Sequence, residues 1–369
     1  MMHRRRLIIV GQTPPPFNGQ AKMIRLMIDG IQNEFHPVHI RMAYSDSVVS
    51  AGKFGFSKIR HLIMLIRKSR QALRKYPGAV LYYPPASPNL LPVLRDVIFL
   101  LAVRGRAAKT VLHFHSGGVS KFVQHRRWLS PAAMKAYSDA DVAIELGPSC
   151  PHDGEFFRAR KTWVVPNGLD VPVRQSLAPV LKAAPLRILY VGIHTETKGL
   201  FDLLATARKL KQRGVCFEIR TAGLWYTNEE QVRFERLRLQ WRLEASVVTL
   251  GQKTGEDLWA LYAWADVFFF PTFYPWETFG IVQVEAMAYG LPVVASCWQG
   301  PKDIVVNGET GFLCAEHDIS AFAGVLEKLA DNPVLRKRLG AAGQKRYKEK
   351  FTADCFINGL KRIFEEVCS

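Results

Sequence analysis

The sequence lacks the paired-cysteine patterns that mark a zinc site or a redox centre. Its 369 residues include 6 cysteines, and no two of them have Cys-x-x-Cys spacing. Cysteines scattered in this way through a chain of this size are typical of a reducing compartment. With 48% hydrophobic residues, the composition also excludes a disordered protein, a collagen-like protein and a disulfide scaffold.

Long hydrophobic runs are missing as well. The first apolar run, Leu7–Val10, is too short for the hydrophobic region of a signal peptide and is better interpreted as a buried strand. The longest apolar stretch lies near Val97–Val103, far below the ~20 residues needed to span a bilayer. We therefore expect a cytoplasmic protein.

Acidic residues are scarce in the first half of the chain. Residues 1–180 hold 26 Lys and Arg against 10 Asp and Glu, whereas residues 181–369 hold 24 against 22. The first half therefore favours an anionic partner. A nucleic-acid-binding protein would show such a charge, but no RNP, KH, helix-turn-helix or zinc-finger pattern is present, so we expect no nucleic acid partner.

The gap between Asp46 and Asp96 contains nine Lys and Arg and no acidic residue. Within it, Ser57–Lys75 predicts a basic amphipathic helix, which suits an anionic membrane surface. A core helix with a solvated basic face explains the same pattern equally well. The predicted apolar face consists of Ile59, Leu62, Ile63, Ile66 and Leu73, with Lys58, Arg67, Lys68, Arg70, Arg74 and Lys75 largely off it.

Short apolar runs alternate with helical patterns along the chain, which predicts parallel sheets covered by helices on both faces. The predicted strands are 7–10, 80–83, 110–114, 142–145 and 162–165, then 187–191, 216–220, 246–250, 266–270 and 292–295. The predicted helices are 20–31, 57–75, 90–103, 131–137, 200–213, 228–243, 255–264, 281–289 and 355–367. We predict an α/β protein with two Rossmann-like, doubly wound parallel-sheet domains.

The segment 166–185 holds four prolines and little periodicity, which predicts a linker and a boundary near residue 180. We expect domains at 1–180 and 181–351. An Ala-Asp-Val sequence recurs in both, around Asp141 and Asp266, and each copy precedes a strand. This repetition indicates a structural cap, so Asp139-Ala-Asp141 is not interpreted as a metal site, and neither a metal nor a cofactor is expected.

The stretch Pro271–Ser296 is the most informative part of the sequence. A buried strand leads into a loop, Gly280 opens a helix, and another strand follows; ligands bind where such loops leave parallel strands. Glu277 lies in the loop and Glu285 on an otherwise apolar helix, where a carboxylate is costly unless it is paired or binds a ligand. The plainer alternative is a capping glutamate and a salt-bridged helix glutamate.

Amide groups at the start of that helix can bind a phosphate, because they lack partners within the helix and the helix dipole favours an anion. The two carboxylates can accept hydroxyl groups, so together these groups predict a nucleotide-sugar site. The amides in question belong to Thr278, Phe279, Gly280 and Ile281.

The pattern Glu-x7-Glu, within Glu-x-Phe-Gly-x4-Glu-Ala-Met-Ala-x-Gly-x-Pro-Val-Val-Ala-Ser, resembles the retaining glycosyltransferases of family 4, which have the GT-B fold of two domains facing a cleft. Further segments resemble the family's motifs in the same order along most of the chain. They are Pro14–Ala21 with Gly19, His113–Gly118, Val165–Asp170, Tyr190–Gly192 followed by Lys198 and Gly199, and Asn307–Leu313.

The resemblance implies a donor site in the C-terminal domain and an acceptor site in the basic N-terminal domain, with a tail helix at 352–369 that packs back on the first domain. Glu277 would hold the hydroxyls of the donor sugar and Glu285 those of the ribose. Lys198 would neutralise the leaving diphosphate, and His115 would lie against the donor sugar. Gly19 and Gly192 would allow the backbone to approach the donor.

The implied activity is transfer of a hexose-type sugar from a UDP- or GDP-sugar to a hydroxyl of a glycan or lipid-linked acceptor, in cell-surface polysaccharide or glycolipid synthesis. No protein nucleophile is evident, so we expect same-face substitution assisted by the leaving phosphate. The alternatives are a nucleotide-sugar epimerase, a non-catalytic sugar-nucleotide binder or, less favoured, a nucleic-acid-binding protein.

Two features depart from a simple match. Ile193 stands where the family usually has an arginine, so either a nearby cation such as Arg220 or Lys253 replaces it or diphosphate binding is weaker. His113 and His115 lie two residues apart on a predicted strand, and we expect them to face opposite ways, with His115 toward the ligand.

Overall fold

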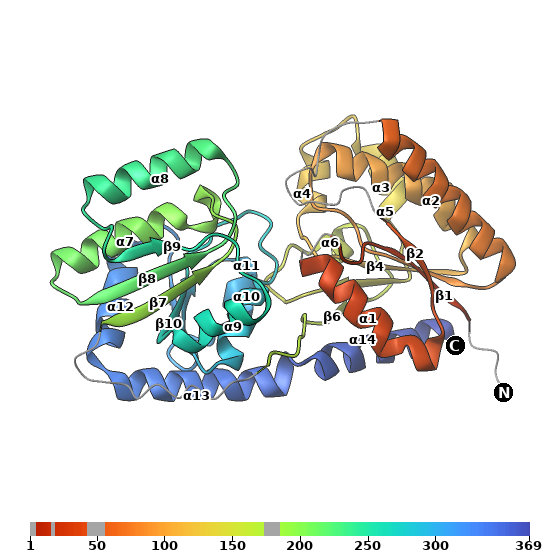
Figure 1. The fold of residues 1–369 in the computed structure, drawn as a ribbon. Helices are drawn as coiled ribbons and strands as arrows, with labels where there is room; N and C mark the ends of the chain where they lie inside the picture. The colour runs from red at the N-terminus through yellow and green to blue at the C-terminus, as the bar shows by residue number, and fades with distance from the viewer. Residues whose placement is uncertain (1–4, 16–18, 43–55, 173–184) are drawn as a thin grey trace. The chain divides into compact units, whose positions relative to one another are not determined.

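The computed structural model describes residues 5–15, 19–42, 56–172 and 185–369 (Figure 1). The chain divides into two compact units: Met1–Leu169 with Ala353–Ser369 forms the first, and Asp170–Thr352 forms the second. The division falls before the boundary expected near residue 180, and most of the predicted linker, 173–184, lies outside the described residues.

The first unit is built on a six-stranded parallel sheet with the order β2-β1-β3-β4-β5-β6. Helices α2, α3 and α5 pack on one face, and α1 and α14 pack on the other (Figure 1). The strands are β1 (Leu7–Gly11), β2 (Val38–Arg41), β3 (Val80–Tyr83), β4 (Lys109–His113), β5 (Val142–Glu145) and β6 (Thr162–Val164). The helices are α1 (Gly19–Phe35), α2 (Phe56–Lys75), α3 (Leu90–Val103), η1 (Arg104–Arg106), α4 (Val119–Gln124), α5 (Ser130–Tyr137), α6 (Asp153–Phe156) and α14 (Ala353–Cys368).

The second unit repeats this plan with the strand order β12-β11-β10-β7-β8-β9. Helices α7, α8 and α12 pack on one face, and α10 and α13 pack against each other on the opposite one. The strands are β7 (Leu186–Val191), β8 (Phe217–Ala222), β9 (Val247–Thr249), β10 (Val267–Phe270), β11 (Val293–Ser296) and β12 (Gly311–Cys314). The helices are η2 (Glu196–Lys198), α7 (Leu200–Gln212), α8 (Asn228–Gln240), α9 (Gly255–Trp264), α10 (Ile281–Ala288), α11 (Gln299–Ile304), α12 (Ile319–Asp331) and α13 (Pro333–Lys350).

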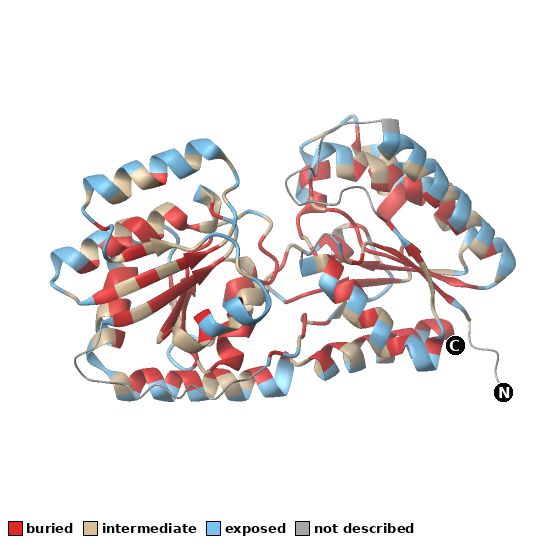
Figure 2. Ribbon diagram, viewed as in Figure 1, coloured by how far each residue is buried: buried red, intermediate tan, exposed pale blue. Residues whose placement is uncertain are grey.

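The prediction of two doubly wound parallel sheets is confirmed. The central strands are apolar runs such as Leu7–Gly11 and Val267–Phe270, and they are buried along their length because helices cover both faces (Figure 2). Each predicted strand is present, within one or two residues at either end.

Two strands were missed, β2 and β12, and both lie at a sheet edge. The edge strand Val38–Arg41 alternates polar and apolar residues over only four positions, too few to distinguish it from a loop. The first residue of β12 is Gly311, where a side chain would overlap the backbone of Val293. This contact joins two distant segments, so no local sequence pattern predicts it. Helices α4, α6, α11, α12 and α13 were also not predicted. Across the part of the chain that the structure describes, no helix has the length and apolar character needed to cross a membrane.

Helix α14 packs on α1 within the first unit. Phe364 is fully buried and meets Phe35 edge to face, with ring centroids 5.8 Å apart, and Tyr82 at 6.0 Å. An ion pair from Lys361 to Glu34 and a hydrogen bond from the Arg5 amide to the Cys368 carbonyl (2.9 Å) hold its last turns. The last segment of the chain thus completes the core of the first unit.

We predict that Phe364→Ala lowers the free energy of unfolding of the first unit by about 3–5 kcal/mol, since it removes a buried ring and leaves a cavity. Urea unfolding of the full chain, with amide exchange of α1 and α14 as the local readout, measures this change. The exposed neighbour provides the control, because Glu365→Ala should alter the same quantity by less than about 0.5 kcal/mol. Equal losses from both variants would contradict the packing described.

Candidate functional site

The loop between β10 and α10 forms the centre of the candidate site. It leaves the carboxyl end of a buried strand at Phe270 and enters α10 through Gly280, whose φ of 78° is a left-handed conformation that glycine adopts without strain. Thr278 and Phe279 are buried just before the helix, and Ile281 opens it. The predicted phosphate-binding amides therefore stand at a helix N-terminus, where amide groups lack partners within the helix.

Backbone contacts hold this loop against the loop that follows β7. A side chain at Gly199 would overlap the carbonyl of Pro271, so the two chains approach as closely as only glycine allows. The Phe273 amide donates to the Thr197 carbonyl at 2.9 Å. On the opposite flank, the Trp298 indole donates to the Tyr274 carbonyl at 2.8 Å, and the Gly300 amide donates to the Glu277 carbonyl at 3.2 Å.

This close approach brings Lys198 and Glu277 together. The Lys198 ammonium donates to Oε2 of Glu277, and Thr272 donates to the same oxygen at 3.4 Å. The Lys198 and Glu277 side chains keep only 18% and 10% of their surfaces exposed. Lys198 also lies 4.7 Å from the centre of the Tyr274 ring, a cation–π contact. Two residues assigned separately by resemblance thus form one partly buried ion pair.

The Glu277 carboxylate influences two tyrosines, Tyr190 and Tyr274. The Tyr190 hydroxyl donates to the carbonyls of Ile193 (3.1 Å) and Lys198 (3.3 Å), which supports the loop that carries the lysine. Burial first, and then the Glu277 carboxylate, raises the pKa of Tyr190 and of Tyr274 above the usual value. Both hydroxyls therefore stay neutral and can act as hydrogen-bond donors near the carboxylate.

Glu285 lies inside the second unit, on α10. The Tyr262 hydroxyl donates to its Oε2 at 2.7 Å and also to the Val282 carbonyl at 3.3 Å. Burial, followed by the Glu285 charge, raises the pKa of Tyr262 well above its usual value. The partner that holds this carboxylate is thus a phenol on α9, and sequence reasoning missed it. Tyr262 lies four residues before Asp266, just upstream of the repeated Ala-Asp-Val sequence that was interpreted only as a structural cap.

The segment after β7 carries Gly192, Ile193 and His194. The backbone of Gly192 lies so close to Gly223 that a side chain at Gly223 would overlap the Gly192 carbonyl. Ile193 is exposed, whereas His194 is fully buried against Trp225, with ring centroids 4.8 Å apart. Burial lowers the pKa of His194 to about 4, so the ring is neutral and supplies no cation in place of the missing arginine.

The two candidate replacement cations differ in position. Arg220 lies within β8, opposite Leu189, where its guanidinium pairs with Glu218 at 2.8 Å and covers the Trp264 ring at 4.0 Å. The Arg220 guanidinium therefore already has partners, and the residue lies two positions before the carboxyl end of the strand. Lys253 lies in the loop between β9 and α9, at the carboxyl edge of the sheet where ligands bind.

The predicted residues of the first unit are His115 and Gly19. Gly19 opens α1, with open space where a side chain would project; residues 16–18 of the predicted glycine loop lie outside the described residues. The Tyr82 hydroxyl and His113 Nδ1 are 2.7 Å apart, and the rings of His113 and His115 are 3.9 Å apart.

The expectation that the two histidines face opposite ways is therefore wrong. Residues two apart on a strand share a face, and His115 lies just beyond β4, where its amide donates to the His113 carbonyl at 3.1 Å. Burial lowers the pKa of His115 to about 3, and burial together with His115 lowers that of His113. Both rings are neutral near pH 7.

Asp141 and Asp266 hold equivalent positions in the two units. Asp141 accepts from the Thr110 amide at 2.8 Å, and Asp266 accepts from the Arg187 amide at 3.0 Å and pairs with its guanidinium. Each aspartate thus ties one strand to the start of its neighbour. Within the described residues, no three His, Cys, Asp or Glu side chains gather as a metal site.

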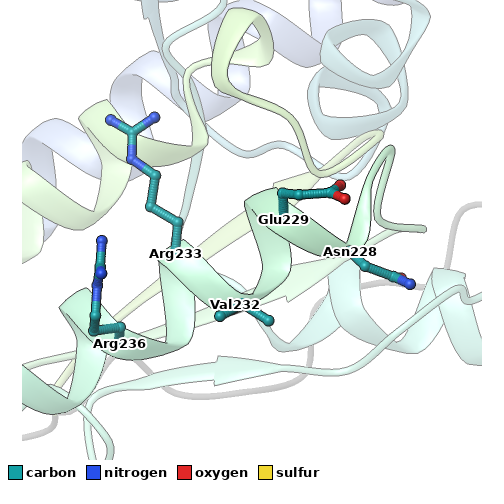
Figure 3. Close-up of a pocket in the computed structure, with 5 residues that line it drawn as sticks. All are labelled: Asn228, Glu229, Val232, Arg233 and Arg236. Atoms are coloured by element: carbon teal, nitrogen blue, oxygen red, sulfur yellow. The ribbon is translucent and has the colours of Figure 1, made fainter.

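A surface hollow of ≈ 390 Å³ on α8 is separate from these residues (Figure 3). Arg233 and Arg236 extend from the same side of the helix there, and Arg233 pairs with Glu196 at 2.9 Å. The residues that line the hollow are Asn228, Glu229, Val232, Arg233 and Arg236. None of them belongs to the predicted site.

Comparison with known proteins places this geometry in context. Residues 178–346 match the family model described as glycosyl transferases group 1. The chain is 31% identical over 175 residues to the capsular polysaccharide biosynthesis glycosyltransferase CapM of Staphylococcus aureus, covering 47% of this chain and 44% of that protein. It is 28% identical over 226 residues to the amylovoran biosynthesis glycosyltransferase AmsK of Erwinia amylovora, covering 60% and 53%. The chain thus spans about half the length of the curated relatives it matches.

Solved structures share the fold over nearly the whole chain. Sucrose-phosphate synthase from Thermosynechococcus elongatus superposes with a TM-score of 0.75 at 19% identity, covering 98% of this chain and 99% of that one. Anabaena HepE, solved in complex with UDP and glucose, gives 0.71 at 16% identity, covering 98% and 100%. The fold is therefore the two-sheet GT-B fold.

We predict that the stability of the first unit falls as the pH drops from about 6.5 toward 3. The unfolded chain takes up a proton at His115 in this range, whereas the folded chain, with a pKa of about 3 there, does not. Between pH 7 and 5 this histidine should cost about 2 kcal/mol of unfolding free energy.

Urea unfolding at the two pH values, with amide exchange of β4 as the local readout, measures that difference. His115→Asn should reduce the pH dependence, whereas substituting the exposed His125 by Asn should leave it unchanged. Because His113 contributes in the same range, part of the pH dependence should remain; a pH dependence that is undiminished in His115→Asn would show that the His115 ring is already protonated or accessible in the folded chain.

Proposed function

We propose that this chain, whose residues 178–346 match the glycosyl transferases group 1 family model, is a retaining glycosyltransferase of family 4. It would transfer a hexose-type sugar from a UDP- or GDP-sugar to a hydroxyl of a glycan or lipid-linked acceptor. The observation that carries the proposal is the Lys198–Glu277 ion pair at the carboxyl edge of the second sheet, next to the N-terminus of α10.

This pair provides both groups that a nucleotide-sugar needs. Without ligand, the ammonium and the carboxylate neutralise each other. When a donor binds, its diphosphate competes for Lys198, and Glu277 becomes available to accept hydroxyls of the sugar ring. A lysine and helix-terminal amides placed before the reaction stabilise charge that develops on the leaving diphosphate.

The remaining contacts follow from position. The amides at the start of α10 would bind the phosphate, and Glu285, oriented by Tyr262, would accept the ribose hydroxyls. The absence of a side chain at Gly192 would let the diphosphate approach the loop, and Lys253 would be the second cation. Arg220 is the weaker candidate for that role because Glu218 and Trp264 engage its guanidinium.

Transfer would occur by substitution on one face of the sugar. The bond from the anomeric carbon to the diphosphate oxygen breaks, and the acceptor oxygen forms the new bond to the same carbon. The acceptor proton passes to the leaving phosphate oxygen, so no protein base is required. His115, kept neutral by burial, would contribute a hydrogen bond to the sugar rather than a charge.

Polysaccharide synthesis is the proposed setting because CapM and AmsK are named for capsular and amylovoran biosynthesis. A UDP-sugar is the first donor to test, since HepE was solved with UDP and glucose. We place the activity in the cytoplasm, which agrees with six cysteines, all within the described residues, that form no disulfide.

The decisive experiment exposes the protein to UDP-, GDP- and ADP-sugars and measures thermal stabilisation, then follows product formation with a glycan or lipid-linked acceptor. A donor at about 100 times its Kd should stabilise the fold by ~2.7 kcal/mol. Proton NMR of the product should show the anomeric configuration of the donor. Conversion of the sugar without an acceptor would favour an epimerase, and binding without turnover would favour a non-catalytic binder.

We predict different losses from the two members of the ion pair. Lys198→Ala should weaken UDP and UDP-sugar binding alike, because it removes the phosphate contact. Glu277→Gln should leave UDP binding as tight or tighter, because Lys198 loses the carboxylate that competes with the diphosphate, but it should lower kcat/KM by about 10²–10³-fold, because the Glu277 contacts are to the reacting sugar. Calorimetry and initial rates measure both effects.

The matched control is Glu316→Gln, an identical change at an exposed carboxylate of the same unit. It should leave both quantities within twofold of the unaltered protein. If Glu277→Gln retains full activity, the assignment of the sugar-binding carboxylate fails.

A further inference from the structure

The turn that carries Lys198 is held in place from helix α8. This turn, η2, is a single 3₁₀ turn that follows Thr195. Within it, the Lys198 amide donates to the Thr195 carbonyl at 3.2 Å, and the Gly199 amide donates to the Glu196 carbonyl at 2.8 Å. A helix this short has few hydrogen bonds of its own, so its position depends on contacts from outside.

Glu230, in the first turn of α8, supplies two of these contacts. Its Oε1 accepts from the Thr195 hydroxyl at 2.7 Å and from the Glu196 amide at 2.8 Å. That amide opens η2, where a helical amide lacks a partner within the turn, and the Thr195 side chain does not cap it. One carboxylate oxygen thus holds both the residue before η2 and the first residue in it.

The sequence around Glu230 predicts a different role for this side chain. Thr227 and Glu230 have the Thr-x-x-Glu spacing of a capping box, in which the glutamate bonds back to the amide of the first residue. Half of that arrangement is present, because the Glu230 amide donates to the Thr227 hydroxyl at 3.2 Å. The side chain, however, extends its Oε1 to the neighbouring loop, while its Oε2 accepts from the Thr227 hydroxyl at 3.5 Å. The carboxylate therefore serves the turn that carries Lys198 as well as helix α8.

Backbone hydrogen bonds join the loop before α8 to the segment after β7. The His194 amide donates to the Leu224 carbonyl at 2.8 Å, and the Tyr226 amide donates to the His194 carbonyl at 3.0 Å. These bonds continue the pairing of β7 with β8 beyond the strands, with His194 opposite Trp225. The first turn of α8 is thus fixed close to η2, which lets Glu230 act as an anchor.

Arg233 makes a second contact to the same turn. Its guanidinium pairs with Glu196 at 2.9 Å, and Figure 3 shows the side chain extending from α8. Both side chains are about half exposed, at 47% and 50%, and exposed ion pairs contribute little. Glu230 is half-buried and accepts from a backbone amide, so its contacts carry more of the positioning.

The position of Lys198 matters because the segment 192–199 contains no other Lys or Arg. Ile193 is uncharged, and burial, which lowers the pKa of His194 to about 4, keeps that ring neutral. A displaced η2 would carry the ammonium away from Glu277 and from the edge of the sheet where the loops end. The charge that this segment can offer to a diphosphate therefore depends on how firmly the turn is held.

We propose that Glu230 is a positioning residue for Lys198, fixing η2 so that the ammonium stands where the donor diphosphate binds. The inference rests on the proposed function for its ligand and on the contact between α8 and η2 for its mechanism. The sign of the expected effect is diagnostic. Glu230 is an anion, so electrostatics alone would make its removal strengthen diphosphate binding, whereas loss of positioning weakens it.

The first test measures binding of UDP and of uridine to the full chain by calorimetry. Glu230→Ala should weaken UDP binding by about tenfold and leave uridine binding unchanged, because uridine lacks the phosphates that Lys198 would bind. Glu230→Gln should stay within about threefold of the unaltered protein, since an amide oxygen can accept the same two hydrogen bonds. Unchanged or tighter UDP binding by Glu230→Ala would overturn the proposal. Equal losses from both variants would also overturn it, because the two hydrogen bonds would then not account for the effect.

The matched control is Glu229→Ala, which removes the same charge from the exposed neighbouring position in the first turn of α8. It should leave both affinities within about twofold. A second comparison uses the Lys198→Ala background, in which Glu230→Ala should weaken UDP binding by less than about twofold further, because the lysine through which it acts is gone. A full loss in that background would give Glu230 a role independent of Lys198 and overturn the proposal.

A measurement without ligand separates this inference from the proposed function. Acetylation of Lys198 by acetic anhydride, followed by peptide mass spectrometry, should be about fivefold faster in Glu230→Ala, because the ammonium leaves its partly buried pair with Glu277. Thr195→Val keeps the cap of α8 and should give a smaller increase, which provides the test if Glu230→Ala does not fold. Faster acetylation in a chain that binds no nucleotide would support the positioning role and refute the proposed function. An unchanged rate in both variants would overturn the positioning role.

Discussion

The close approach of two backbones at Gly199 and Pro271 is the constraint on which the candidate site depends. No side chain fits between them, and the loops after β7 and β10 therefore meet at their backbones. Lys198 and Glu277 are carried into contact by this meeting, although 79 positions separate them in sequence. The ion pair is thus a consequence of sheet order, because β7 and β10 are neighbours in a parallel sheet whose carboxyl ends share one edge.

Buried phenols provide the electrostatic setting of the second unit. The neutral Tyr190 hydroxyl donates to the loop that carries Lys198, and the neutral Tyr262 hydroxyl donates to the Glu285 carboxylate. The proposed chemistry uses both the loop and the carboxylate. A low-dielectric surround strengthens such hydrogen bonds and penalises an unpaired carboxylate, so Glu285 requires its donor. The first unit contrasts with this arrangement, since its stacked histidines are held neutral by burial. Its helix α2 carries several exposed cations and no acidic residue.

Sequence reasoning was reliable where a single segment contains the signal. Buried strands such as β3 and β10 are unbroken apolar runs, and the β10–α10 motif carries both glutamates within eight positions. It was unreliable where the answer depends on contacts between segments. Arg220 was a candidate to replace the missing arginine, but its guanidinium pairs with Glu218 and lies over the Trp264 ring. The His113–His115 error was of another kind: it misapplied a local rule, since residues two apart on a strand share a face.

By itself, the sequence determined the two parallel sheets, ten of their twelve strands and the loop that carries Glu277, since periodicity and glycine placement are local properties. Only the tertiary structure decided that Lys198 pairs with Glu277 and that Tyr262 holds Glu285. It also decided that Ile59 and Ile63 face solvent on a helix whose pattern had suggested one apolar side. The physical reason is that a helix or loop meets its neighbours through packing between distant segments, and no local pattern encodes which of its residues will be covered.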